Sequence, residues 1–247
     1  MALTGPRRLL LDQGNTRLKW VLSGPQGWLH APRAITAAGP TLLARWQRAA
    51  LDQVVVASVA PAAAQRRLRA TLARLSPALP VRWAAPTASW RGLRCGYPSP
   101  DRLGVDRWLA LVAAWRERPG RCVVVSAGTA LTLDRLEADG RHAGGLIVPG
   151  LAAMQAGLFA AAPGLRRHRG GVADAGLATD SPEAIASGCL QALLALVERW
   201  REPGDAVFLA GGDASALAPG LAEPLRLRPW LVLEGLDAWS GDTPAAG

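Results

Sequence analysis

A segment near the start of the chain, LLLDQGNTRLKW (residues 9–20), contains an aspartate, a glycine turn and a lysine. Lys19 is the only lysine in the sequence, although lysine and arginine together number 28. A turn that contains Gly14 can bring backbone N–H groups to phosphate oxygens. Asp12, which ends an apolar run, can hold a divalent metal directly or through water. The segment therefore predicts a phosphate-binding turn.

Lys19 supplies a compact, mobile point charge, which suits a terminal phosphate better than a rigid guanidinium fork does. Asn15 and Thr16, and Thr129 further along the chain, add neutral hydrogen-bond donors of suitable length. The alternative is that Lys19 is simply an exposed residue of a strand.

A second segment repeats this order of features. In CVVVSAGTALTLD (122–134), a β-branched run ends at Ser126, a glycine turn follows, and a second strand carries Thr132 and Asp134. Shifted by 114 residues, Asp12-Gln13-Gly14-Asn15 aligns with Ser126-Ala127-Gly128-Thr129. The identity is weak, but strand, turn and returning strand recur, which indicates a duplicated architecture of two α/β lobes. Two such turns facing each other across a cleft would clamp a phosphate chain.

Hydrophobic periodicity predicts the elements that must position these turns. In the first half we expect strands at 8–11, 17–23, 27–32, 54–59 and 81–85 and helices at 61–75 and 105–115. A long loop rich in Gly, Pro and Ser precedes the second of these helices, and loops of this length are often functional. In the second half we expect a helix from Leu151, a helix at 181–200, and a strand with a Gly-Gly turn at 206–213. The boundary between lobes is expected near residue 115.

The composition is ordinary for a globular protein, with 50% hydrophobic and 19% charged residues in 247. The net charge of +9 could indicate nucleic-acid binding. However, the arginines are spread along the chain without a recognisable motif, so we expect no nucleic acid. Three scattered cysteines give neither a disulfide framework nor metal-ligand spacing. Without a signal peptide or a long apolar run, we expect a cytoplasmic protein that does not contact a membrane.

Five motifs, in order, are DQGNTRLKW, YPSPDRLGVDRW, SAGTALTLD, GGLIVPG and SPEAIASG. In their order and spacing the sequence resembles the type III pantothenate kinases, from about residue 9 to residue 213. The resemblance implies an enzyme that uses ATP to phosphorylate pantothenate to 4'-phosphopantothenate, the first step of coenzyme A biosynthesis. It also implies an α/β fold of two ribonuclease H-like lobes, with mixed sheets flanked by helices and a cleft between the lobes, as in the actin-like and sugar-kinase ATPases.

The resemblance also assigns the two lobes. Residues 1–115 would carry the first phosphate turn, the substrate loop and the catalytic aspartate. Residues 116–247 would carry the second phosphate turn, the nucleotide side and the contacts of a homodimer.

Residue by residue, the resemblance assigns Asp106 as the catalytic base, which would take the proton of the primary alcohol during phosphoryl transfer. Arg107 beside it would grip the substrate's carboxylate. The pantothenate-binding positions are Tyr97, Gly104, Val105 and Arg107, and those for ATP with Mg²⁺ are Asp12, Gly14, Asn15, Thr16, Lys19, Gly128 and Thr129. The alternative for Asp106 is an ordinary acid at a helix start, favoured by the helix dipole.

Two positions depart from the family pattern. Ser181 stands where the family has a threonine that touches pantothenate; serine keeps the hydroxyl, and its alternative role is a helix N-cap. Ser126 stands where the family has an aspartate that holds a monovalent cation, K⁺ or NH₄⁺. A hydroxyl carries no formal charge, so the attraction for the cation is much reduced. Either the cation is dispensable, or other oxygens hold it weakly, or the enzyme is impaired.

Two alternative functions remain open at this point. One is a nucleotide-binding accessory or regulatory protein on the same scaffold with weak or lost kinase activity, which Ser126 favours and the intact Asp12, Lys19 and Asp106 disfavour. The other is a different small-alcohol kinase or a phosphatase of the actin-like superfamily, which Tyr97 and the GVDR loop disfavour.

Overall fold

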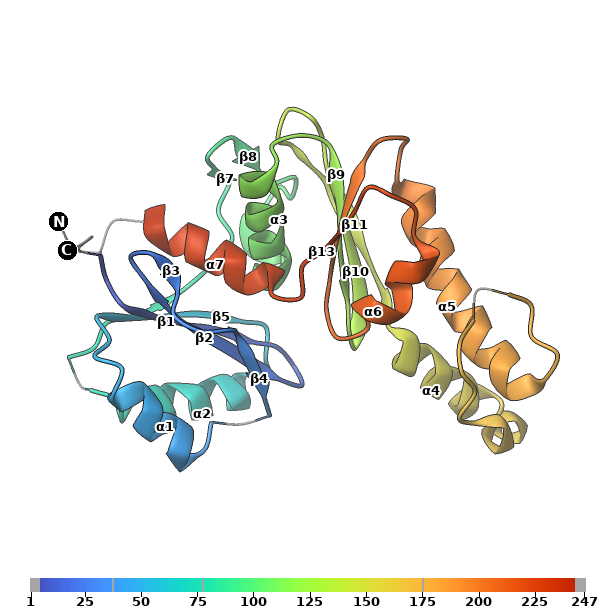
Figure 1. Ribbon diagram of the computed structural model, residues 1–247, viewed down its shortest axis with the longest axis horizontal. Helices are drawn as coiled ribbons and strands as arrows, with labels where there is room; N and C mark the ends of the chain where they lie inside the picture. The colour runs from blue at the N-terminus through green and yellow to red at the C-terminus, as the bar shows by residue number, and fades with distance from the viewer. Residues whose placement is uncertain (1–4, 37, 77, 175, 243–247) are drawn as a thin grey trace. The chain divides into compact units, whose positions relative to one another are not determined.

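The computed structural model describes residues 5–36, 38–76, 78–174 and 176–242, and Figure 1 shows their helices and strands. These residues form two compact units. The first unit takes the described residues of Met1–Trp90, Tyr97–Glu117 and Trp230–Gly247, and the second takes those of Arg91–Gly96 and Arg118–Pro229. This division differs from the expected lobes 1–115 and 116–247 chiefly because the last helix, α7 (Leu231–Asp242), belongs to the first unit.

The first unit is built on a six-stranded sheet with the order β3-β2-β1-β5-β6, in which β4 also pairs with β2. Its central strand β1 runs antiparallel to β2 and parallel to β5. The bounds are β1 (Arg8–Gln13), β2 (Leu18–Gly24), β3 (Gly27–Trp28), β4 (Arg33–Ile35), β5 (Gln53–Ser58) and β6 (Val81–Trp83). Residues Leu9 to Leu11 of β1 are all fully buried, which requires cover on both faces of the sheet because successive side chains point to opposite faces.

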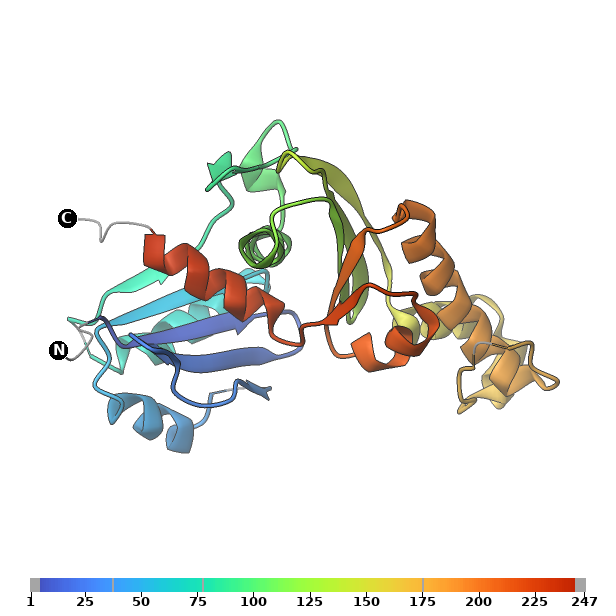
Figure 2. The ribbon, with the colours of Figure 1, turned by 45° about the horizontal axis from the view of Figure 1, so that its top comes forward.

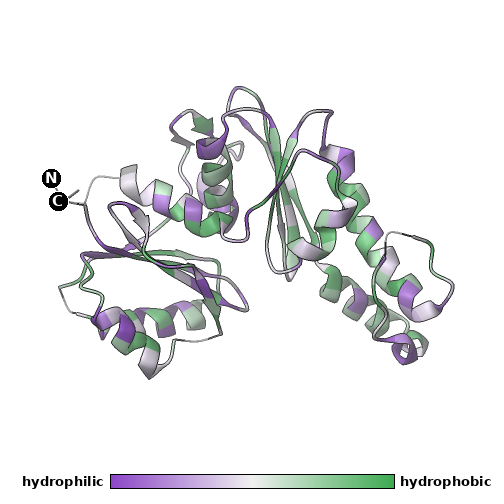
Figure 3. Ribbon diagram, in the orientation of Figure 1, coloured by the Kyte–Doolittle hydropathy of each residue, from purple (hydrophilic) through white to green (hydrophobic). Residues whose placement is uncertain are grey.

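Helices cover both faces of this sheet. Helices α1 (Pro40–Gln47) and α2 (Ala62–Ala73) lie on one face, where Leu9, Leu11, Trp20 and Trp46 share a hydrophobic core with residues of α2. Helix α7 contacts β1, β2 and β5, and it packs along α3 (Val105–Glu117). Figure 2 shows α3 nearly end-on beside α7, and Figure 3 shows that α3 is hydrophobic along the middle of its length. The site residues at the start of α3 therefore stand on a helix anchored in the core.

The second unit repeats the strand order of the first. Its five-stranded sheet runs β11-β10-β9-β12-β13, with β9 antiparallel to β10 and parallel to β12. The bounds are β9 (Cys122–Ala127), β10 (Ala130–Leu136), β11 (His142–Pro149), β12 (Ala206–Ala210) and β13 (Leu225–Leu227). The duplicated architecture and the predicted fold class, two mixed sheets flanked by helices, are confirmed.

The helices of the second unit are α4 (Leu151–Ala161), α5 (Ser181–Trp200) and the short α6 (Ala214–Leu217). Leu190, Leu193 and Val197 of α5 are buried in a core shared with strands β9, β10 and β12. None of the helices in the described part of the chain is long and apolar enough to cross a membrane.

Most of the predicted elements agree with the structure, and the helix predicted at 181–200 coincides with α5. The strand predicted at 27–32 is wrong beyond residue 28, because β3 ends at Trp28 and Leu29 after it is exposed. The loop predicted at 86–104 contains the two-residue strands β7 (Ser89–Trp90) and β8 (Leu93–Arg94). No strand or helix was predicted where the structure has α1, β4, β11, α6, β13 and α7.

Candidate active site

The first phosphate turn joins β1 to β2 and brings Asp12 and Lys19 together. The two residues are direct cross-strand partners, and Lys19 Nζ lies 3.2 Å from Asp12 Oδ2. Side chains at facing positions of adjacent strands point to the same side, which explains the contact. Asp12 is buried and Lys19 is half-buried. Lys19 is therefore a paired residue of a polar site rather than an exposed strand residue.

The turn itself is closed by a hydrogen bond from the Gly14 N–H to the Arg17 carbonyl at 3.0 Å, and Asn15 and Thr16 are exposed on it. Gly14 does not have a positive φ, and a Cβ added to it would approach nothing closer than the Arg17 carbonyl oxygen at 3.5 Å. Neither the backbone conformation nor packing requires glycine here. A bare backbone is instead what close approach of a ligand requires.

Gln13 anchors this turn and was not singled out from the sequence. Its Nε2 donates to the Ala64 carbonyl at 3.2 Å, and its Oε1 accepts a hydrogen bond of 2.9 Å from the Ser58 hydroxyl. Its carbonyl accepts from the Val59 N–H at 3.1 Å. These bonds fix the end of β1 to the end of β5 and the start of α2. The feature of the sequence that could have indicated this role is that Gln13 is a polar residue between Asp12 and Gly14, at the end of a buried strand.

Replacing Gly14 with alanine is expected to leave the free energy of unfolding within about 0.5 kcal/mol of the unmodified protein, because the site has room for a methyl group. Binding of MgATP should weaken by about tenfold or more, since the methyl group would obstruct hydrogen bonds to phosphate. Calorimetric titration with MgATP and thermal unfolding check the two halves. Gly39→Ala, at another glycine without a positive φ and with open space around it, is the control. An unchanged affinity for MgATP would remove Gly14 from the site.

Asp106 lies in the first turn of α3, in the same unit as Asp12. Its Oδ1 accepts a hydrogen bond of 2.9 Å from the Arg107 N–H. Burial raises the pKa of the Asp106 carboxyl above its ordinary value, and the negative charge of Asp12 adds to this, while the Arg107 N–H opposes it. An acid that interacted only with the helix dipole would have a lowered pKa. The raised pKa favours a base over an ordinary helix-start acid.

Tyr97, in the loop before α3, meets Arg107 on that helix. Arg107 Nη1 donates to the Tyr97 hydroxyl at 3.1 Å, and Arg107 Cζ lies 5.8 Å from the centroid of the tyrosine ring. Arg107 is 7% exposed, so its guanidinium is held by its surroundings. Gly104 and Val105 lie next to this pair at the start of α3. The structure thus brings the predicted substrate residues of the first unit together.

The second glycine turn joins β9 to β10 and contains Gly128 and Thr129. The Gly128 N–H donates to the Ala130 carbonyl at 3.0 Å, and a Cβ on Gly128 would meet nothing closer than 3.9 Å. As at Gly14, the fold itself does not demand the glycine. Ser126, at the end of β9, is the cross-strand partner of Thr132. This pair stands in the position that Asp12 and Lys19 hold in the first sheet, without their charges.

Two other glycines pack against this second turn, a contact that the sequence analysis did not predict. A Cβ on Gly150 would lie 1.8 Å from the Gly128 carbonyl oxygen, and the Gly150 N–H donates to the Thr129 carbonyl at 3.0 Å. A Cβ on Gly211 would lie 1.9 Å from the Ala127 carbonyl oxygen. Gly150 ends the GGLIVPG motif and Gly211 begins the Gly-Gly turn, so a glycine of each motif allows close packing against the backbone of this turn.

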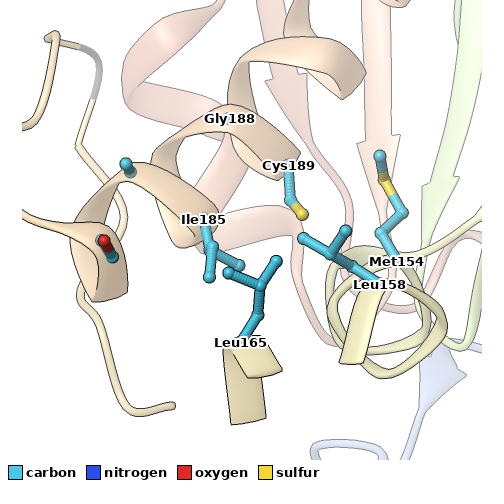
Figure 4. A pocket seen from close by; sticks show the side chains of 8 residues that line it. Met154, Leu158, Leu165, Ile185, Gly188 and Cys189 are labelled. Carbon is cyan, nitrogen blue, oxygen red and sulfur yellow. The ribbon is translucent and has the colours of Figure 1, made fainter. Parts of the chain in front are cut away.

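Ser181 lies elsewhere in the second unit. It is the first residue of α5, but the N-cap is Asp180, whose Oδ1 accepts from the Glu183 N–H at 2.9 Å. The alternative that Ser181 caps the helix is therefore wrong. Ser181 instead lines a pocket of about 380 Å³ between α4 and α5. Figure 4 shows the apolar side chains that converge there, from Met154, Leu158, Leu165, Ile185 and Cys189.

The described residues of the first unit offer few side-chain ligands for a divalent ion. Among the described residues, no group of three or more His, Cys, Asp or Glu side chains is placed to hold a metal. Magnesium usually keeps several waters and takes one or two carboxylates together with substrate phosphates. Asp12, buried and beside a phosphate-type turn, fits that mode of binding.

Comparison with known proteins agrees with the motifs. Residues 8–202 match a protein-family model described as Type III pantothenate kinase. The chain is 39% identical to the type III pantothenate kinase of Laribacter hongkongensis, over 92% of this chain and 96% of that protein. It is 40% identical to the type III pantothenate kinase of Methylobacillus flagellatus, over 92% and 95%.

This chain belongs to the type III pantothenate kinase family.

The resemblance seen in the sequence is thus confirmed, and with it the prediction of an enzyme of the kinase class. The roles of the individual residues within the type III pantothenate kinase site stay predictions.

Solved structures support the fold. A Baf family protein from Campylobacter jejuni has a TM-score of 0.62 at 18% identity, over 96% of this chain and 98% of that one. The activator of the 2-hydroxyisocaproyl-CoA dehydratase from Clostridium difficile, with bound ADPNP, has a TM-score of 0.52 at 13% identity, over 98% and 99%. At these identities the likeness shows the fold alone.

Proposed function

We propose that this protein transfers the γ-phosphoryl group of ATP to the primary hydroxyl of pantothenate, giving 4'-phosphopantothenate and ADP. Membership of the type III pantothenate kinase family supports the substrate and the reaction. The observation that carries the mechanism is the placement, in one unit, of the Asp12–Lys19 pair and of Asp106 with its raised pKa. We place the reaction at the first step of coenzyme A biosynthesis, in the cytoplasm, with no part for nucleic acid or a membrane.

On the nucleotide side, Asp12 would hold Mg²⁺ directly or through its waters. The bound ion would offset the negative charge of the β- and γ-phosphates. The Lys19 ammonium, which pairs with Asp12 at 3.2 Å, would then turn to a terminal phosphate oxygen. Gly14, Asn15 and Thr16 would donate hydrogen bonds to the phosphates, and Gly128 and Thr129 would do so from the second turn.

On the acceptor side, Asp106 would take the proton of the pantothenate hydroxyl as its oxygen attacks the γ-phosphorus. The bond from that phosphorus to the bridging oxygen breaks, and the electron pair leaves with ADP. A raised pKa makes the Asp106 carboxylate a stronger base than an exposed one, provided that it is ionised at the working pH. Burial, the first cause of that raised pKa, thereby supports the role.

Recognition of pantothenate would fall to Arg107, Tyr97, Gly104 and Val105, with Arg107 facing the substrate's carboxylate. Because Tyr97 already holds the guanidinium at 3.1 Å, little conformational freedom would be lost on binding. We assign Ser181, at its apolar pocket, to the substrate as well.

We also propose that the protein is a homodimer. The family supports this assembly. A further support is the exposed apolar surface of the second unit, where Leu158, Val172 and Leu177 are 37%, 76% and 100% exposed. Contact with a second copy would remove these apolar side chains from water, which is favourable. Light scattering of the purified protein would measure the mass, and a monomer at all concentrations would overturn the dimer.

The test of the proposed function is ADP release by the purified protein with MgATP and pantothenate, against a panel of sugars and polyols. Phosphorylation of pantothenate alone supports the proposal, and mass spectrometry of the product should identify 4'-phosphopantothenate. Faster phosphorylation of another alcohol would show that this alcohol, and not pantothenate, is the substrate. MgATP binding without turnover of any alcohol would favour the accessory-protein alternative, which the Ser126 departure supports.

Ser126 leads to a prediction about monovalent cations. The position lacks a carboxylate, so a bound K⁺ or NH₄⁺ has lost its main anionic ligand. We expect kinase activity to change little when sodium replaces potassium at equal ionic strength, which excludes bulk screening as the cause. Ser126→Asp should create a potassium dependence, because it adds a negative charge beside the phosphates. A saturable potassium requirement in the unmodified protein would mean that other oxygens build the cation site.

A further inference from the structure

The Asp106 carboxylate occupies the space where a side chain of residue 104 would lie. A Cβ added to Gly104 would stand 2.6 Å from Asp106 Oδ1 and 3.8 Å from both Asp106 Cγ and Arg107 Cδ. A carbon–oxygen distance of 2.6 Å is far inside van der Waals contact, so the two groups cannot share this space. Any residue other than glycine at position 104 would therefore displace the carboxylate.

The backbone does not explain the glycine. Gly104 is not among the glycines with positive φ, so an L-residue can adopt its conformation. Its carbonyl accepts the first hydrogen bond of α3, from the Trp108 N–H at 3.0 Å, and any residue can offer that carbonyl. At the position before a helix, Ser, Thr, Asp or Asn would stabilise α3 at least as well as glycine, through a side-chain hydrogen bond. The absence of a side chain at residue 104 therefore matters for the space that it leaves beside the Asp106 carboxylate.

The space beside Gly104 allows the Asp106 carboxylate to adopt one particular orientation. In that orientation Asp106 Oδ1 accepts the Arg107 N–H at 2.9 Å, which fixes the side chain by a bond to its own helix. With Oδ1 engaged, Oδ2 is the oxygen that can accept a proton from a substrate hydroxyl. Positioning of this kind matters because a misplacement of about 1 Å can lower a rate by about 10²-fold.

We propose that Gly104 is a positioning residue for the catalytic base: its missing side chain holds the Asp106 carboxylate against the Arg107 N–H, with Oδ2 directed to the acceptor hydroxyl. This inference rests on the proposed function, in which Asp106 is the base. It differs from the role that the family resemblance gives to Gly104, a contact of its backbone with pantothenate. The two roles predict different results for the same substitution.

A double-mutant cycle separates the two roles. Gly104→Ala in the otherwise unmodified protein is expected to lower kcat by about 10²-fold with little change in the KM for pantothenate. In the Asp106→Asn background the same substitution should change kcat by less than about twofold, because no base remains to be displaced. If Gly104 acts through a backbone contact, the substitution would instead raise KM by the same factor in both backgrounds, and the inference would be overturned.

Gly39→Ala is the matched control, because Gly39 precedes α1 as Gly104 precedes α3 and has nothing within 4 Å of an added Cβ. It should leave kcat and KM unchanged. If Gly104→Ala folds poorly, Gly104→Ser provides a second variant. Its hydroxyl can cap α3, while its Cβ still meets Asp106 Oδ1. An active Gly104→Ser protein with unmodified kcat would also overturn the inference.

A second measurement does not depend on the substrate. Hydrogen exchange of the Arg107 amide, followed by NMR without pantothenate, reports whether its bond to Asp106 Oδ1 is made. We expect faster exchange of this amide in Gly104→Ala than in the unmodified protein and in Gly39→Ala. Unchanged exchange would refute the positioning role even if pantothenate is the substrate. Conversely, a protein that does not phosphorylate pantothenate would refute the proposed function, while faster exchange would still show that Gly104 holds Asp106.

Discussion

Asp106→Asn is expected to lower kcat for pantothenate phosphorylation by about 10²-fold or more, since general base catalysis contributes about 10² to 10⁴. Asparagine keeps the volume of the side chain and can still accept the Arg107 N–H, but it cannot take a proton. Binding of MgATP should persist, because the residues of the glycine turns are unchanged. Steady-state kinetics and calorimetric titration with MgATP measure the two quantities. Near-normal turnover of Asp106→Asn would refute the assignment of the base.

The raised pKa of Asp106 gives this prediction a pH dependence. The base must be ionised, so kcat/KM should fall on acidification at a pH above the ordinary range of a carboxyl group. The raised pKa of Asp106 also makes the free energy of unfolding depend on pH. A carboxyl whose pKa is higher in the folded state favours folding at low pH, and this contribution is lost as the pH rises through the folded-state pKa. At neutral pH the buried charge is therefore unfavourable.

Asp106→Asn should accordingly unfold at the same temperature as the unmodified protein at pH 7, or at a higher one. Scanning calorimetry of both proteins checks this result and serves as the folding control for the kinetics. A large drop in Tm would attribute the lost turnover to misfolding rather than to the missing base.

Lys19→Met is expected to weaken MgATP binding and to lower kcat together, because it deletes the charge that we propose binds the terminal phosphate while keeping the length of the side chain. Hydrogen bonds to charged groups contribute about 1.5 to 3 kcal/mol, so we expect an effect of about tenfold or more on kcat/KM for ATP. Lys19→Arg should restore only part of this, since a planar fork does not reproduce a mobile point charge. The kinetics of both variants and titration with MgATP measure the effect.

Arg17→Met provides the matched control, because Arg17 is an exposed cation on the same turn. If the two methionine variants lose the same affinity, general positive charge rather than the position of Lys19 is responsible. If Lys19→Arg behaves like the unmodified protein, the single lysine of this chain has no special role in phosphate binding.

The elements that could be predicted are those whose signal lies within one segment. The buried strands β1, β5 and β9 are continuous apolar runs, and α5 has twenty residues with periodic apolar positions. Helix α1 has only eight residues, of which Leu43 and Trp46 are buried, and such a short pattern does not stand out. Helix α7 belongs to the first unit through contacts with α3 and β1, and no local pattern encodes contacts across such a separation in sequence.

The same limit applies to the candidate site. Asp12, Lys19 and Asp106 could be named from motifs, but the salt bridge between Asp12 and Lys19 depends on the register of β1 with β2. Gly104 could be named as a family position, whereas its steric relation to Asp106 requires coordinates. The Ser181 cap was wrong because Asp180, one residue earlier, competes for the same free N–H groups at the start of α5.

Helix α7 also bears on how the protein is made. Asp237 on this helix pairs with Arg8 at 3.0 Å and accepts hydrogen bonds from the Ser23 hydroxyl and the Trp28 indole. These partners emerge from the ribosome more than 200 residues before Asp237 does. During that interval the face of the first sheet that α7 covers is open, while the entire second unit is synthesised. We therefore expect that the second unit can fold on a translating ribosome before the first unit is complete, because the first unit lacks this cover until α7 has been synthesised.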